Sequence, residues 1–172
     1  GGAGEVVEMG GQTLLVFGSA PGDGLVGYSL SGQGNIGGVP SLEPPTGATG
    51  QMSAMAVANT GGGTLIYTID AGTGTLMMHS LPQSGGQIGA TPDGAGAPVA
   101  QSTAITFSAN TQIETVSVGG TSFLLAADQQ SDTITSYQIS NSTGALTQTG
   151  STGAAMGLGV NAPTALETVS AF

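Results

Sequence analysis

Short runs of branched and aromatic residues recur along the chain, and Gly, Asn, Asp or Ser residues bound each run. The runs cover residues 13–17, 25–30, 64–69, 76–81, 122–126 and 133–139. Hydrophobic runs this short, set between turn-forming residues, are typical of β-strands rather than helices. The pattern therefore predicts an all-β protein.

The hydrophobic runs belong to a sequence repeat that occurs three times. In each copy, an aromatic ring follows 15 positions after a reference threonine or serine. The reference and ring positions are Thr13 with Tyr28, Thr64 with His79, and Ser122 with Tyr137. Successive reference positions are 51 and 58 residues apart, a period that suits a β-propeller blade.

The sequence of each repeat predicts four strands. A Gly-Gly turn follows the first strand, a polar turn the second and a Gly-containing turn the third, before a weak fourth strand at residues 145–148 of the last copy. The first strand carries Glu5 in the first copy, Met55 in the second and Glu114 in the third. We therefore predict propeller-like repeats of four-stranded antiparallel blades.

The repeats divide a single domain, residues 1–172, into units at about residues 5–50, 51–104 and 105–153, and residues 164–172 begin a further unit. Propellers close with about 4–8 blades, so three units do not complete a ring. We expect the chain to belong to a larger ring or assembly, either as a fragment of a longer parent chain or through further copies that pair exposed edge strands. The remaining alternative is an open stack of repeats.

The third unit, LLAADQQSDTITSYQISNSTGALTQTG, resembles the blades of lactonase-type propellers of the 6-phosphogluconolactonase-like family. It is also similar to propeller-like regions of large secreted bacterial proteins of the repeats-in-toxin type. The first resemblance implies a hydrolytic propeller with polar and basic residues in its channel. The second implies an acidic module of the cell surface or the extracellular space.

The charged residues of the chain restrict the classes of function that it can have. The chain has no Lys or Arg, ten Asp or Glu residues, one His and no Cys, which gives a net charge of −10. This composition excludes binding of nucleic acid through basic patches, catalysis by Lys or Arg, and disulfides. No apolar run reaches the roughly 18 residues of a membrane-spanning helix. The acidic composition favours the secreted relatives over the lactonase-type enzymes.

Acidic residues recur in the turn after the second strand. Asp70 and Asp128 lie six positions after the reference residue, and Asp23 and Asp132 lie ten positions after it. Their oxygens are suitable ligands for Ca²⁺, with Asp128 and Asp132 as the closest pair in sequence. In the alternative interpretation, these side chains accept hydrogen bonds from backbone N–H groups of the turn.

A second acidic set lies at the start of the units, at Glu5, Glu114 and Glu167. These residues are predicted to converge on the central channel as a ring of carboxylates that binds a cation or a sugar, or else to lie at solvated strand ends. His79 is the single imidazole. Because it replaces the Tyr of the other two copies, we expect a ring that packs between blades.

Together these features predict a non-catalytic, secreted or cell-surface module that serves as a structural scaffold, a binding surface for a protein or ligand, and a unit of self-assembly. Its partners would be another protein, further copies of itself or the rest of a parent chain, without nucleic acid or a membrane span. The alternative is a lactonase-like hydrolytic propeller in which channel carboxylates hold a metal ion.

Overall fold

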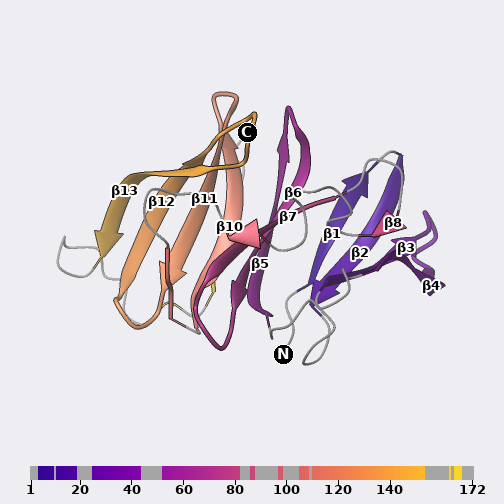
Figure 1. Ribbon diagram of the computed structural model, residues 1–172, viewed down its shortest axis with the longest axis horizontal. Helices are drawn as coiled ribbons and strands as arrows, with labels where there is room; N and C mark the ends of the chain where they lie inside the picture. Colours follow the sequence, from indigo (N-terminus) through magenta and orange to yellow (C-terminus); the bar gives the residue numbers. More distant parts are fainter. Residues whose placement is uncertain are drawn as a thin grey trace.

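The computed structural model describes residues 4–9, 11–18, 25–43, 52–81, 86–87, 97–98, 105–108, 110–153, 163 and 165–167. The elements in these residues are all β-strands, which form three sheets (Figure 1). This confirms the all-β prediction. None of the described residues belongs to a helix long and apolar enough to cross a membrane.

Sheet 1 contains β1 (Gly4–Met9), β2 (Gln12–Gly18), β3 (Leu25–Leu30) and β4 (Ile36–Glu43), with the two-residue β8 (Gly86–Gln87) beside β4. Sheet 2 contains β5 (Met52–Thr60), β6 (Gly63–Asp70), β7 (Leu76–Ser80) and β9 (Ala97–Pro98). Sheet 3 contains β10 (Gln112–Val118), β11 (Thr121–Asp128), β12 (Thr133–Ile139) and β13 (Leu146–Gly153). Within each sheet these strands pair antiparallel in chain order, apart from β8.

The three sheets share one strand register, as the repeat predicts. The ring-bearing residue of the third strand pairs with the same position of the second strand in each sheet. These pairs are Leu15 with Tyr28, Ile66 with His79, and Leu124 with Tyr137. At the turn between β10 and β11, Gly119 and Gly120 have φ angles of 58° and 79°, which suit the tight turn of a β-hairpin.

Two details differ from the sequence prediction. The register places Ala56 opposite Tyr67, as Glu5 lies opposite Val16 and Glu114 opposite Leu125, so Ala56 and not Met55 is the counterpart of these glutamates. In addition, β8 comes from the second unit but pairs in parallel with β4 of sheet 1. Sheet 1 therefore has a fifth strand that the blade pattern does not include.

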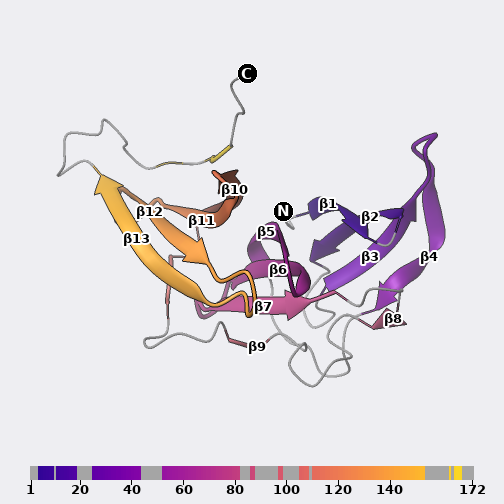
Figure 2. The same ribbon diagram turned by 90° about the horizontal axis from the view of Figure 1, so that it is seen from above.

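The sheets lie side by side in an open arc (Figure 2). Their first strands, β1, β5 and β10, lie on the inner side of this arc, whereas β4 and β13 lie at its outer ends. The middle first strand, β5, contacts both β1 and β10. This arrangement places the equivalent first strands of the three repeats next to one another in the order β1, β5, β10.

Sheet 2 is covered on both faces, because alternate side chains of its strands point to opposite sides. Leu65, Tyr67 and Ile69 of β6 pack against sheet 3, together with the small side chains of Ala54, Ala56 and Ala58. Ile66 of β6 and Met55 of β5 pack against sheet 1. Full burial of a large apolar side chain stabilises a fold by about 1.5–3 kcal/mol, so these two interfaces hold the three sheets together.

Candidate functional site

Asp70 shapes the turn between β6 and β7. Its Oδ1 accepts hydrogen bonds from the backbone N–H of Gly72 at 2.9 Å and of Thr73 at 2.7 Å, and from the Thr73 hydroxyl at 3.0 Å. These contacts are the ones that the turn interpretation predicts for this residue.

Asp128 has the same role in the turn between β11 and β12, with an additional connection. Its Oδ1 accepts hydrogen bonds from the N–H groups of Gln130 at 2.8 Å and Ser131 at 3.2 Å. Ser108, which precedes β10, donates its N–H to Oδ2 at 3.1 Å and its hydroxyl to Oδ1 at 3.0 Å. Partial burial acts to raise the pKa of Asp128, but the combined hydrogen bonds hold that pKa below its usual value.

The other two turn aspartates give less information. Asp132 lies in the same turn as Asp128 and has a positive φ of 53°. Asp23 lies outside the described residues. Across the part of the chain that the structure describes, no three His, Cys, Asp or Glu side chains form a group that could hold a metal ion. Calcium binding by Asp23, Asp70, Asp128 and Asp132 stays a prediction.

The glutamates of the first strands influence one another electrostatically. Burial raises the pKa of Glu5 on β1, and the negative charge of Glu114 on β10 raises it further. Burial likewise raises the pKa of Glu114, with a further contribution from Glu167. Sheet 2 contributes no carboxylate at this position, because its residue is Ala56. The structure therefore brings these three carboxylates within electrostatic range without an Arg or Lys to offset their charge.

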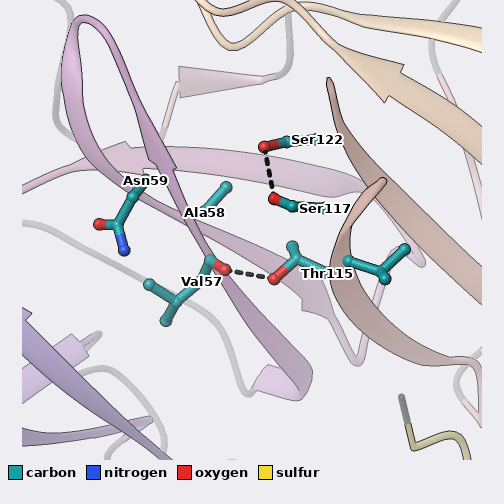
Figure 3. A pocket seen from close by; sticks show the side chains of 7 residues that line it. Val57, Ala58, Asn59, Thr115, Ser117 and Ser122 are labelled. Atoms are coloured by element: carbon teal, nitrogen blue, oxygen red, sulfur yellow. Dashed lines mark hydrogen bonds between the residues drawn. The ribbon is translucent and has the colours of Figure 1, made fainter. Parts of the chain in front are cut away.

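A polar hollow between β5 and β10 was not anticipated from the sequence (Figure 3). Its lining residues are Val57, Ala58, Asn59, Thr115, Val116, Ser117 and Ser122. The Thr115 hydroxyl donates to the carbonyl oxygen of Val57, and the Ser117 and Ser122 hydroxyls lie 3.1 Å apart. The hollow measures about 160 Å³, whereas sites for small organic ligands usually exceed about 300 Å³. It therefore has room for ordered water or a small polar group rather than a typical substrate.

His79 is buried, with 7% of its surface exposed, on the side of sheet 2 that faces sheet 1. Its Nε2 lies 2.9 Å from the Thr68 hydroxyl, and its Nδ1 has no hydrogen-bond partner among the described residues. Burial lowers the pKa of His79 to about 4, so the ring is neutral at pH 7. A neutral, enclosed imidazole suits packing between sheets, as its position in the repeat predicts.

The rings at the equivalent positions also make packing contacts. Tyr28 stacks on Phe17 with ring centroids 5.5 Å apart. Tyr137 meets Phe107 edge to face at 6.3 Å. All three positions therefore have ring or side-chain packing partners among the described residues.

Comparison of the chain with protein-family models gives no match, and none of the curated proteins matches it.

Proposed function

We propose that this chain is a β-propeller module of a secreted or cell-surface protein that acts without catalysis, as a scaffold and as a unit of binding and self-assembly. The observation that carries the proposal is the repeated register of the three sheets, with β1, β5 and β10 on the inner side of one arc. Repeated blades whose first strands approach a common axis are the basic arrangement of propellers.

The chemistry of the described residues supports a role without catalysis. The only imidazole is enclosed between sheets, and two of the turn aspartates, Asp70 and Asp128, accept hydrogen bonds from their own turns. A hydrolase would need a nucleophile and a base within hydrogen-bond reach beside a cavity that admits substrate. The hollow between β5 and β10 contains hydroxyl groups but no acid or base.

The secreted or surface location follows from the resemblance and from the composition. A chain without Lys or Arg has no site for trypsin-like proteases, and its net charge of −10 disfavours aggregation. These properties suit a module exposed outside the cell.

An assay for hydrolysis of lactones and esters, with and without Ca²⁺ or Mg²⁺, tests the proposal. We expect no saturable turnover by the wild-type chain above the rate of the buffer. Metal-dependent hydrolysis that Glu114→Gln abolishes, and that Glu8→Gln leaves unchanged, would contradict the proposal and support a lactonase-like enzyme with a carboxylate-bound metal. Glu8 is a suitable control because it lies exposed on β1.

A further inference from the structure

The two sheet interfaces of the chain use the same pair of surfaces. We define the front face of each sheet as the side that carries the ring at Tyr28, His79 or Tyr137, and the back face as the opposite side. Leu14 and Val16 on the back face of sheet 1 pack with Ile66 on the front face of sheet 2. Leu65 and Tyr67 on the back face of sheet 2 pack with Leu124 on the front face of sheet 3. In both interfaces, a back face covers the front face of the next sheet.

Among the sheets that the structure describes, none packs on the front face of sheet 1 or on the back face of sheet 3. On the front face of sheet 1, Val6 is 56% exposed and Ile36 is 57% exposed, and Leu15 and Tyr28 are partly exposed. Ile66 and Leu124, the counterparts of Leu15 in sheets 2 and 3, are fully buried. At these positions, the front faces of sheets 2 and 3 are buried by a neighbouring sheet. The front face of sheet 1 instead presents apolar side chains that are partly or largely exposed.

The back face of sheet 3 has the matching property. Val118 is 62% exposed, and Val116, Phe123 and Leu125 on the same face are partly exposed. Leu14 and Val16 of sheet 1, the counterparts of Phe123 and Leu125, are fully buried. Within the described part of the chain, Val6, Ile36 and Val118 are the large hydrophobic residues classed as exposed, and all three lie on these two end faces.

We propose that the front face of sheet 1 in one copy packs on the back face of sheet 3 in a second copy of this chain. The contact would continue the two interfaces inside the chain, because each end face presents the strand positions that those interfaces bury. This inference rests on the proposed propeller module and names its partner.

The contact is head to tail, because it joins two different faces. Head-to-tail contacts close into rings when the rotation between copies permits and otherwise form open filaments. Figure 2 shows that successive sheets within one copy turn along an arc, and the proposed contact would continue that turn. Two copies would bring together about six sheets, within the roughly 4–8 blades of closed propellers. Because each copy carries a charge of −10, added salt should strengthen the association.

Sedimentation velocity of the 172-residue chain at about 1–100 µM tests the proposal. We expect the wild type to form a dimer, more completely at higher salt. Val6→Asp, on the front face, and Val118→Asp, on the back face, should each sediment as monomers. An equimolar mixture of the two variants retains one intact front face and one intact back face. It should therefore form a one-to-one complex that does not grow, at least about tenfold weaker than the wild-type dimer because it makes one contact instead of two.

Gln33→Asp is the matched control, since it adds the same charge at an exposed turn of sheet 1 and should leave the dimer intact. Circular dichroism and the urea midpoint establish that each variant is folded. A wild type that stays monomeric at every concentration and salt overturns the proposal. A folded Val118→Asp variant that still dimerises also overturns it, because the contact would then join two front faces. Neither result bears on hydrolysis, which tests the module's non-catalytic role separately.

Discussion

The phenolic hydroxyl of Tyr67 donates a 2.6 Å hydrogen bond to the carbonyl oxygen of Gly144. This bond joins β6, in the middle of sheet 2, to the turn between β12 and β13 of sheet 3. Gly144 has a φ of 73°, and a Cβ atom at this residue would overlap the Cδ1 of Leu65 and lie 2.7 Å from the Sδ of Met78. The turn between β12 and β13 can therefore approach sheet 2 this closely only because Gly144 has no side chain.

Removal of the Tyr67 hydroxyl should weaken the contact between sheets 2 and 3. Tyr67→Phe leaves the carbonyl of Gly144 without its partner inside a buried contact, which we expect to cost about 1–3 kcal/mol. Equilibrium unfolding in urea measures the loss. Tyr28→Phe is the control, because the ring stacked on Phe17 is kept. Equal losses in the two variants would contradict the special role of the Tyr67 bond.

A methyl group at Gly144 should destabilise the fold more strongly than one at Gly120. Both glycines have positive φ angles, but nothing lies within 4 Å of a Cβ added at Gly120. Gly120→Ala should therefore cost about 1 kcal/mol for backbone strain. Gly144→Ala should cost clearly more, because Leu65 and Met78 must also move. Unfolding midpoints compare the two variants, and a Gly144→Ala variant as stable as Gly120→Ala would show that the turn is not tightly packed.

Stability should fall as the pH is lowered from about 6.5 to 4. His79 has a folded pKa of about 4, below its ordinary value of 6.5, so the unfolded chain binds the proton first in this range. The contribution of the neutral ring is fully present above pH 6.5, and about 3 kcal/mol of it is lost as the pH falls to 4.

The single histidine makes this prediction directly measurable. The Cε1 proton of His79 should give one NMR signal whose titration midpoint in the folded protein lies near pH 4. A midpoint near 6.5, with the protein still folded, would show that the imidazole is open to water.

Neutralising Glu114 should stabilise the protein at neutral pH. The raised pKa values of Glu5 and Glu114 mean that folding disfavours their charged forms. Their unfavourable contribution is absent below the ordinary pKa of 4.5 and develops as the pH rises through the folded values. Glu114→Gln should therefore raise the melting temperature at pH 7 by an amount that corresponds to less than about 1 kcal/mol.

Salt and pH separate this effect from an effect of lost packing. Burial is the larger cause of the raised pKa of Glu114, and the charge of Glu167 adds to it. The gain from Glu114→Gln should therefore shrink at 1 M NaCl, which screens the repulsion, and disappear near pH 3, where protonation removes the charge itself. Glu8→Gln removes one exposed charge on β1 and should give a smaller gain at low salt. A Glu114→Gln variant less stable than the wild type at low salt would contradict mutual repulsion among the three glutamates.

The Asp128 turn should matter more than the Asp70 turn. Asp128→Asn weakens the acceptor for Ser108 as well as for the turn, so we expect a loss of about 1–2 kcal/mol, larger than for Asp70→Asn. Thermal unfolding with and without 2 mM Ca²⁺ measures both variants. A rise in the melting temperature of the wild type with Ca²⁺ that Asp132→Asn abolishes would instead support calcium ligation at this turn.

The strands and their repeat could be predicted from the sequence because period-two patterns and Gly-Gly turns leave strong local signals. The runs at residues 13–17, 64–69 and 122–126 match β2, β6 and β11, and the weak fourth strand at residues 145–148 matches β13. The pairing of β8 with β4 could not be predicted, since two residues carry no periodicity.

The contacts between repeats also could not be predicted from the sequence. The hollow beside Thr115 depends on how β5 and β10 approach each other, which no local pattern specifies. The sequence prediction chose Met55 instead of Ala56 as the counterpart of the glutamates, because Met-Ala-Val can be aligned with Glu-Val-Val in either of two registers. The hairpin turn between β5 and β6 sets the actual register. Glu5, Glu114 and Glu167 share one place in the repeat, and their convergence on a central channel stays a prediction.

A designed disulfide tests most directly that the back face of each sheet packs on the front face of the next. The N–H of Gly61, between β5 and β6, donates to the Asn141 side chain at 2.6 Å, and a Cβ at Gly61 would lie 3.5 Å from the Asn141 Cγ. Because the chain has no other cysteine, the variant Gly61→Cys with Asn141→Cys reports on this pair alone. The account predicts spontaneous disulfide formation on air oxidation, in which oxygen takes up two protons and two electrons, seen as loss of two hydrogen atoms in intact mass, with a stabilised fold. Two free thiols in the folded variant, or equal cross-linking of Gly61→Cys with Gln33→Cys, would contradict the packing of sheet 2 on sheet 3.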